Sequence, residues 1–314
     1  MTVGIIDAGT NTVLLLVAKF DSRGALKIIR DELRIVRLGE GMDAKTNAAK
    51  NAGKIISPAA LERLNATLYD LKQTALDTDD AERIVAVGTS AFRRAENATE
   101  ILRAMKDENG IEIEILSGDE EARRTVCRLP AAPAPVCSTS AGGSMEVAVG
   151  DHTGIEFGHS FETGCVRMTE NFFPRLPALP NERAAAQTFV HKLFRPLDTM
   201  PFWAKKPALI GVAGTVTTLA MLAKGMTDYD AERIDGTILA SDTVEKLSDM
   251  LFSLSHAELH ALPGVEQGRA DVLPAGSLLL KLFMRQFGFS SVIASVRGLR
   301  YGIAVREYLK TVKG

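Results

Sequence analysis

Two segments of this 314-residue chain follow the same plan, in which a strand, a turn of small residues and a second strand succeed one another. The first turn is DAGTNT at 7–12, followed by VLLLV, and the second is TSAGGS at 139–144, followed by MEVAV. A single turn of this kind is most often only a β-hairpin. Two of them, each near the start of one half of the chain, favour two α/β halves of similar design.

The first half alternates strand and helix patterns. Leucines recur at steps of three and four after Ser57 and Pro58, which predicts an N-capped helix that reaches Ala75. The other expected elements are strands at 3–6, 12–20, 26–38, 83–88 and 111–117 and helices at 97–106 and 118–129. Because strands and helices alternate, we expect a partly parallel sheet covered by helices.

The second half begins after PAAPAP at 130–135, which cannot continue a helix and predicts a hinge or domain boundary. Strands are expected at 145–150, 154–164, 208–214 and 291–296, and helices at 181–199, 215–224, 241–254, 268–287 and 298–311. The fold class predicted for both halves is α/β.

Composition excludes several classes of protein. A formal net charge of −2 excludes global attraction to nucleic acid or acidic lipid, and three cysteines without a CxxC pair argue against a disulfide framework and a structural zinc site. Asp7 interrupts the apolar run that an N-terminal signal peptide needs. The stretch 207–223 falls short of the roughly 20 apolar residues that a helix needs to cross a bilayer. We expect a cytoplasmic protein without a membrane, DNA or RNA partner.

The small-residue turns suit phosphate binding. Small residues let backbone N–H groups approach one locus, hydroxyls add donors, and a nearby carboxylate holds a divalent cation or water. A third such turn, GVAGTVTT at 211–218, runs from a strand into a helix, whose N-terminus favours anions. A plain strand-to-helix connection explains this third turn almost as well.

Two denser motifs lie between these turns. VGTSAFRRAENA at 87–98 places Arg93 one turn after a strand end, where it suits an anion. ILSGDEEARRT at 115–125 places Glu121 in the first turn of a helix, where acidic residues are also favoured simply as a solvated cap. As a functional residue, Glu121 would act as a base on water.

Seven motifs in order give the chain a resemblance to the exopolyphosphatase and guanosine pentaphosphate phosphohydrolase family. They are DAGTNT at 7–12, GTSAFRRAEN at 88–97, SGDEEA at 117–122, AGGSMEV at 141–147, VAGTVTTLA at 212–220, RADVLPAG at 269–276 and GLRYG at 298–302. The resemblance implies two ribonuclease-H-like lobes of the acetate and sugar kinase, heat-shock chaperone and actin superfamily. Residues 1–125 with 298–314 would form the first lobe and 126–297 the second, with the active site between them.

The resemblance also implies roles for single residues. Glu121 would be the catalytic base and Arg93 would bind the phosphate under attack. The phosphate-binding residues would be Gly9, Thr10, Asn11, Gly142, Gly143, Ser144, Gly214 and Thr215, and the residues supporting Mg²⁺ would be Asp7 and Glu146. The substrate would be polyphosphate or guanosine pentaphosphate, and a homodimer is expected.

Three positions depart from the family pattern. Thr139 replaces the aspartate that begins the second turn, Ala141 replaces its first glycine, and Tyr301 replaces a glutamate near the C-terminus. Water can replace a lost carboxylate on Mg²⁺, so the metal would bind more weakly. The leading hypothesis is a magnesium-assisted phosphohydrolase. A catalytically weak sensor of polyphosphate or alarmones is the second hypothesis, and an ATP-dependent kinase of the same fold is the third.

Overall fold

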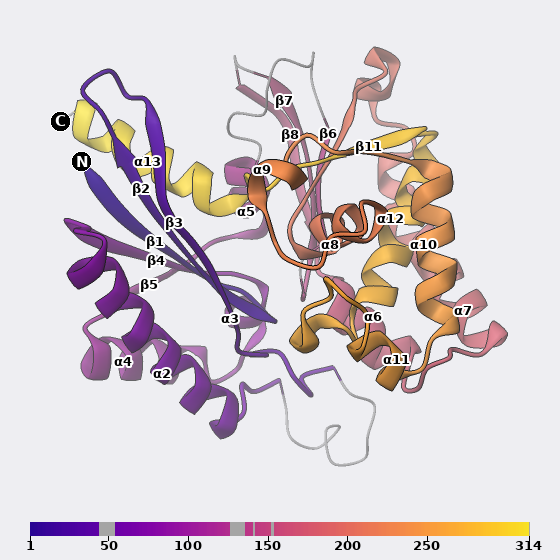
Figure 1. Cartoon of the computed structure of the whole chain (residues 1–314), viewed down its shortest axis with the longest axis horizontal. Coiled ribbons are helices and arrows are strands. Elements are labelled where there is room, and N and C mark those ends of the chain that lie inside the picture. Colours follow the sequence, from indigo (N-terminus) through magenta and orange to yellow (C-terminus); the bar gives the residue numbers. More distant parts are fainter. Residues whose placement is uncertain (44–53, 126–135, 141, 152–153, 314) are drawn as a thin grey trace. The chain divides into compact units, whose positions relative to one another are not determined.

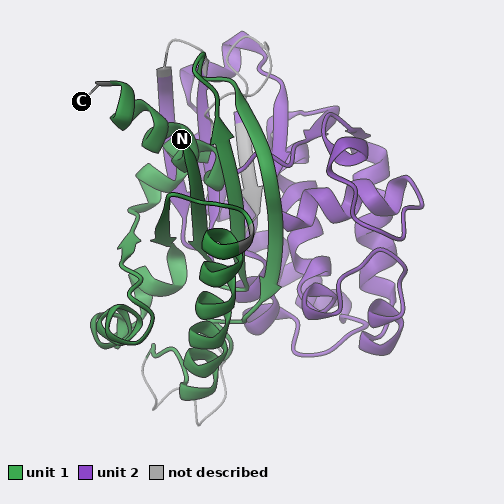
Figure 2. Cartoon of the chain, turned by 60° about the vertical axis from the view of Figure 1, so that its left-hand side comes forward, with its two compact units in different colours: residues 1–127, 299–314 green, residues 128–298 purple. Residues whose placement is uncertain are grey.

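The computed structural model of the chain describes residues 1–43, 54–125, 136–140, 142–151 and 154–313. The chain divides into two compact units, residues 1–127 with 299–314 and residues 128–298 (Figure 2). Each unit contains one sheet and its own helices. Among the described residues, no helix is long and apolar enough to cross a membrane.

The first unit contains a five-stranded mixed sheet in the order β3-β2-β1-β4-β5 (Figure 1). Its strands are β1 (Thr2–Ala8), β2 (Thr12–Phe20), β3 (Leu26–Ile35), β4 (Arg83–Gly88) and β5 (Ile113–Ile115). β1, β2 and β3 pair antiparallel, as the predicted hairpin requires, whereas β4 runs parallel to both β1 and β5. The partly parallel sheet predicted for this half is confirmed.

The helices of the first unit cover both faces of this sheet. They are α2 (Pro58–Gln73), η1 (Thr74–Thr78), α3 (Ser90–Arg94), α4 (Ala98–Asn109), α5 (Gly118–Thr125) and α13 (Leu299–Lys313). Because side chains alternate along a strand, Ile6 and Leu15 pack with α2 and α4 on one face, while Ile5 and Leu16 pack with α13 on the other (Figure 1). The start of α2 is as predicted, since the Ser57 side chain accepts a hydrogen bond from the Ala60 amide.

The second unit repeats this sheet topology and adds one strand. Its order is β10-β11-β9-β6-β7-β8, so β8-β7-β6-β9-β11 matches β3-β2-β1-β4-β5 in both order and direction. The strands are β6 (Val136–Ser140), β7 (Met145–Asp151), β8 (Gly154–Phe161), β9 (Leu209–Val212), β10 (Ile238–Ala240) and β11 (Ser291–Ala294). The expectation of two ribonuclease-H-like lobes is confirmed.

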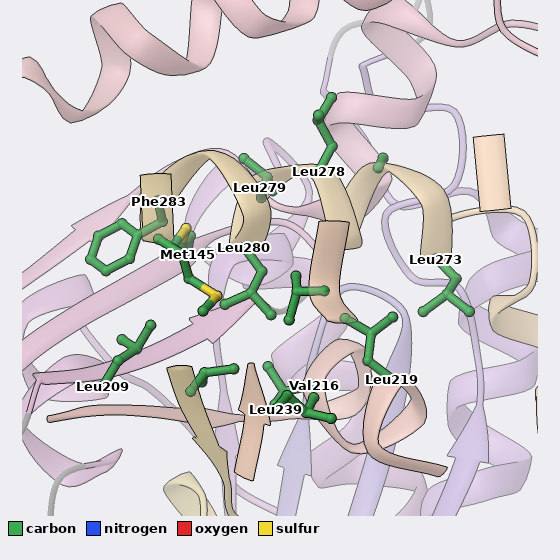
Figure 3. Close-up of a cluster of buried hydrophobic side chains, with 14 of the residues drawn as sticks. Met145, Leu209, Val216, Leu219, Leu239, Leu273, Leu278, Leu279, Leu280 and Phe283 are labelled. Atoms are coloured by element: carbon green, nitrogen blue, oxygen red, sulfur yellow. The ribbon is translucent and has the colours of Figure 1, made fainter. Parts of the chain in front are cut away.

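The helices of the second unit enclose its main core. They are α6 (Cys165–Phe172), α7 (Pro180–Phe194), η2 (Arg195–Leu197), η3 (Pro201–Lys205), α8 (Gly214–Ala223), α9 (Ala231–Ile234), α10 (Ser241–Ser253), α11 (His256–His260), η4 (Gln267–Arg269) and α12 (Leu273–Phe287). Met145, Leu209 and Leu239 from three strands meet Leu219 of α8 and Leu280 of α12 in this core (Figure 3).

Several elements differ from their predicted lengths for local reasons. α12 begins at Leu273 rather than 268, because Pro274 is tolerated only in a first turn. β5 is shorter than predicted, since Gly110 caps α4 in the left-handed conformation and the Ile111 amide donates to Met105 O. The end of the helix predicted at 118–129, the segment 130–135 and Ala141 lie outside the described residues.

Candidate active site

An ion pair joins the two residues that were assigned catalytic roles. Arg93 Nη1 in α3 donates to Glu121 Oε2 in α5 at 2.7 Å and to the carbonyl of Leu116 at 3.1 Å. The two side chains are only 14% and 6% exposed. A charge-assisted hydrogen bond in such surroundings is stronger than a neutral one. The pair therefore fixes both groups, which are 28 residues apart in sequence.

Backbone contacts of α5 also hold Glu121 in place. Its amide donates to the carbonyl of Ser117 at 2.9 Å, and its carbonyl accepts from the Thr125 hydroxyl at 2.9 Å. An ionised carboxylate has about four acceptor positions. Glu121 thus has the chemistry to accept a hydrogen bond from a water molecule in addition to the one from Arg93.

The turn between β1 and β2 contains the first set of predicted phosphate ligands. Gly9 N–H donates to Thr12 O at 2.9 Å, and this hydrogen bond closes the turn. Thr10 Oγ1 is buried and has no hydrogen-bond partner among the described residues. Asn11 O accepts from the amides of Val36 and Arg37, which anchors the turn to the end of β3. The hydroxyl of Thr10 is therefore a buried donor in this turn.

These groups of the first unit share one edge of the sheet. Asp7 lies opposite Val87 in the parallel ladder between β1 and β4, and Ala8 lies opposite Gly88. The turn after β1, α3 after β4 and α5 after β5 therefore all follow the carboxyl ends of adjacent parallel strands. In α/β sheets, ligands bind at this edge.

The second unit repeats the pattern at the carboxyl ends of β6 and β9. Gly142, Gly143 and Ser144 are buried in the turn after β6, and Ser144 Oγ has no hydrogen-bond partner among the described residues. The carbonyl of Gly142 accepts from the amide of Val166 at 2.8 Å, which ties this turn to α6. Like the Thr10 hydroxyl in the first unit, the Ser144 hydroxyl is a buried donor in the turn between the first two strands of its sheet.

Glu146 is a buried carboxylate beside this turn. It is 2% exposed, and its Oε1 accepts from the Ser160 hydroxyl on β8 at 3.0 Å. Thr139, where the family has aspartate, lies opposite Glu146 in the ladder between β6 and β7. The described residues contain no group of three or more side chains suited to hold a metal.

The N-terminus of α8 brings in an arginine that the sequence did not single out. A Cβ built on Gly214 would lie 1.7 Å from Nη1 of Arg269, so only glycine admits the guanidinium there. Burial lowers the pKa of Arg269, and its ion pair with Glu266 spans 3.9 Å. A buried cation at the positive end of a helix favours a bound anion. The RADVLPAG motif contains Arg269, but only the fold places it against Gly214.

The connection into α8 has further constraints. Ala213 has φ 70° and ψ 177°, a conformation that is strained for any residue except glycine. Thr215 is 4% exposed, and a Cβ built on Gly276 would lie 2.4 Å from its Oγ1, so α12 approaches the first turn of α8 closely. The sequence predicted Gly214 and Thr215 as phosphate ligands, and both lie in that turn.

Cys165 at the start of α6 is close to these residues but is not suited to nucleophilic chemistry. Burial raises the pKa of its thiol to about 12, although the charge of Arg269 acts in the opposite direction. The thiolate is the nucleophilic form of cysteine. Near neutral pH this side chain is a protonated, buried thiol.

Comparisons with known proteins agree across nearly the whole chain. The sequence profile of the Ppx/GppA phosphatase family matches residues 16–311. Exopolyphosphatase 2 of Mycobacterium tuberculosis is 32% identical, with 96% of this chain and 97% of the relative aligned.

Solved structures give the same result. The Ppx/GppA family member of Aquifex aeolicus superposes with a TM-score of 0.80 at 29% identity, covering 99% of this chain and 98% of that one. An exopolyphosphatase from Cytophaga hutchinsonii superposes with a TM-score of 0.85 at 25% identity, covering 97% of each chain. The protein is a phosphohydrolase. By sequence profile, identity to its relatives and fold, the chain belongs to the Ppx/GppA phosphatase family.

Proposed function

We propose that the protein hydrolyses the terminal phosphoanhydride of inorganic polyphosphate and releases orthophosphate. The observation that carries this proposal is the buried Arg93–Glu121 pair, which follows the carboxyl ends of β4 and β5. Two relatives named exopolyphosphatases align over nearly their full length, which supports the choice of substrate.

In the first unit, Glu121 orients the attacking water and accepts its proton, and Arg93 binds the phosphoryl group under attack. Phosphoryl transfer is catalysed mainly by positioning and by compensation of charge. An arginine that is hydrogen-bonded to the base meets both requirements, since the planar guanidinium suits carboxylates and phosphates alike and already lies beside the Glu121 carboxylate. The hydroxyl of Thr10 adds a donor, and Gly9 and Asn11 shape its turn.

In the second unit, the turn after β6 and the start of α8 bind phosphate groups. Ser144 Oγ and the guanidinium of Arg269 are the donors that support this role best, because one is buried without a hydrogen-bond partner among the described residues and the other lies at a helix N-terminus. Gly142 and Gly143 provide the small residues that let phosphate oxygens approach. Gly214 admits the guanidinium of Arg269, and Thr215 follows it in the first turn of α8.

Magnesium fits the donors that are present. Mg²⁺ prefers oxygen ligands, keeps several waters and is bound through one or two carboxylates plus substrate phosphates. Asp7 in the first unit and Glu146 in the second are proposed as ligands of the ion or of its water shell, and Ser160 orients Glu146. When bound, the metal offsets negative charge on the phosphoryl oxygens.

Guanosine pentaphosphate is a second candidate substrate, since it also ends in a phosphoanhydride. The residues discussed above recognise phosphate groups and not a base, which is why polyphosphate is the first choice. A homodimer and a cytoplasmic location remain parts of the proposal.

A polyphosphate- or alarmone-binding sensor is the alternative function, and Thr139 is the observation that favours it. The position opposite Glu146 carries no carboxylate, so binding of a metal is weakened there. Thr139→Asp is expected to lower the Mg²⁺ concentration needed for half-maximal activity by several-fold. Unchanged magnesium dependence and unchanged kcat would remove this position from the mechanism.

The direct test compares substrates. The purified protein is incubated with Mg²⁺ and long-chain polyphosphate, guanosine pentaphosphate or ATP, and free phosphate is followed, with Glu121→Gln as the control. We expect release from polyphosphate by the parent protein and very little by the variant. Tight binding of polyphosphate without release from any substrate would instead establish the sensor.

A further inference from the structure

The C-terminal helix α13 contacts the backbone of α5, the helix that carries Glu121. A Cβ built on Gly302 would lie 1.8 Å from the carbonyl oxygen of Arg124 and 2.8 Å from its carbonyl carbon. Cβ atoms in real proteins essentially never lie within 3.0 Å of another heavy atom in this way. The atoms that a Cβ would meet here belong to the backbone, which cannot move aside as a flexible side chain can. Only glycine permits this approach of the two helices.

Charged and apolar contacts fix α13 to the sheet. Arg300 is bonded to Asp31 of β3 and donates to the carbonyl of Leu15 of β2 at 3.2 Å. Arg306 binds the carboxylate of Glu114 in β5 through two hydrogen bonds of 3.0 and 2.8 Å. Ile303 is fully buried in the core that α13 shares with β1 and β2.

We propose that Gly302 is a positioning residue for catalysis, whose close contact with Arg124 sets the place of the Glu121 carboxylate. This inference rests on the proposed role of Glu121 as the base. Because α13 is anchored by several contacts, a side chain at position 302 displaces mainly α5. An added methyl group would lie 1.8 Å from the Arg124 carbonyl oxygen, so that oxygen moves by about 1.2 Å to restore a 3.0 Å separation.

This displacement of the Arg124 carbonyl is large compared with the tolerance of the hydrogen bond between Arg93 and Glu121. Glu121 lies three residues before Arg124 on the same helix and is held to Arg93 at 2.7 Å. Adding about 1 Å to that separation takes the pair beyond ordinary hydrogen-bond distance. Misplacement of a catalytic group by about 1 Å lowers the rate by about 10²-fold. The phosphate-binding turns lie outside α5, so we expect the displacement to affect the contribution of these turns to substrate binding much less than catalysis.

The test compares Gly302→Ala with Gly298→Ala, a matched glycine at which a Cβ meets no atom within 4 Å. Phosphate release from long-chain polyphosphate gives kcat and KM, and hydrogen exchange reports the amides of 118–125. We expect Gly302→Ala to lower kcat by about 10²-fold with KM within about threefold, and to speed exchange in α5. Gly298→Ala keeps the parent values. Equal kcat for the two variants would overturn the proposal.

The Glu121→Gln background separates this proposal from the proposed function. If Gly302 acts through Glu121, Gly302→Ala lowers the residual rate of Glu121→Gln no further, whereas a full additional loss would overturn the positioning role. Should Glu121→Gln alone keep full activity, the proposed function fails, while the exchange data still report whether Gly302 holds α5.

Arg306→Gln provides a second variant that keeps the glycine contact and removes the link to Glu114. It is informative even if Gly302→Ala does not yield folded protein. We expect a several-fold decrease in kcat, unchanged KM and faster exchange in α5. Parent-like kcat and exchange for this variant would contradict a positioning role for α13.

Discussion

Replacing Glu121 by glutamine removes the proposed base while keeping its shape. The glutamine oxygen can still accept a hydrogen bond from Arg93, now 2.7 Å from the carboxylate, but the charge is lost. Loss of general base catalysis costs about 10²- to 10⁴-fold in kcat. This range corresponds to about 2.7 to 5.4 kcal/mol of transition-state stabilisation. Steady-state phosphate release from polyphosphate measures it.

The same substitution has a smaller effect on stability. The Arg93 donor stays charged in the variant, so a charge-assisted hydrogen bond remains and only the attraction of the Glu121 charge is lost. Complete removal of one partner of a buried pair costs about 3–5 kcal/mol, and we expect the free energy of unfolding to fall by less than that. The Arg93 and Glu121 side chains are 14% and 6% exposed, so solvent screens this pair only weakly. Urea denaturation measures the loss, which is too small to unfold a typical domain.

Glu120→Gln is the matched control from the neighbouring position. Glu120 accepts from the amide and the hydroxyl of Ser117 at 3.1 and 2.9 Å, and these hydrogen bonds lower the pKa of its carboxyl group. It caps the helix, and we expect Glu120→Gln to keep kcat within about threefold because this residue lacks the contact with Arg93. A Glu121→Gln enzyme that keeps parent activity, or equal losses for the two variants, would refute the assignment.

Three further predictions concern the second unit. Gly214→Ala should displace the guanidinium of Arg269, and both this variant and Arg269→Gln should raise KM about tenfold. The loss of stability should be small because the flexible Arg269 side chain can move away from the added methyl group. A KM unchanged in both variants would contradict phosphate binding at this helix N-terminus. Ala213→Gly should raise the free energy of unfolding by about 1 kcal/mol, since it relieves a strained φ of 70°; a lower urea midpoint would contradict this. Cys165, whose pKa burial raises to about 12, should resist iodoacetamide at pH 8 in the native state. An unfolded thiol has a pKa of about 8.5, so above this pH the thiol proton of Cys165 dissociates in the unfolded chain but not in the folded one, and the free energy of unfolding should fall with rising pH. Peptide mass spectrometry measures the alkylation of Cys165, and urea titrations at pH 8 and 10 measure the change in stability.

The elements that the sequence predicted well have local causes. The β1–β2 hairpin follows from two apolar runs around a glycine turn, and α2 begins where Ser57 caps it. Both the hairpin and the start of the helix are determined by residues close together in the sequence. The start of β5 was predicted too early because Ile111, a residue type typical of strands, donates its amide to Met105 O as part of the cap that follows Gly110 at the end of α4.

The site was predictable only in part, since its contacts join distant residues. Motifs identified Arg93 and Glu121 separately, but their ion pair depends on β4 and β5 being neighbours in the sheet. Arg269 reaches Gly214 across 55 positions, and no local pattern marks that approach. The hydrogen bond from the Gly9 amide to Thr12 O, which closes the first turn, is likewise visible only in the structure.

The most direct test of the proposed reaction is a single turnover on polyphosphate in water enriched in oxygen-18. If water held by Glu121 attacks the terminal phosphorus, each released orthophosphate carries one oxygen from solvent and the shortened chain carries none. Glu121→Gln should slow the formation of this labelled product by the factor that it removes from kcat. Label on the remaining chain end, or unlabelled orthophosphate, would contradict the mechanism.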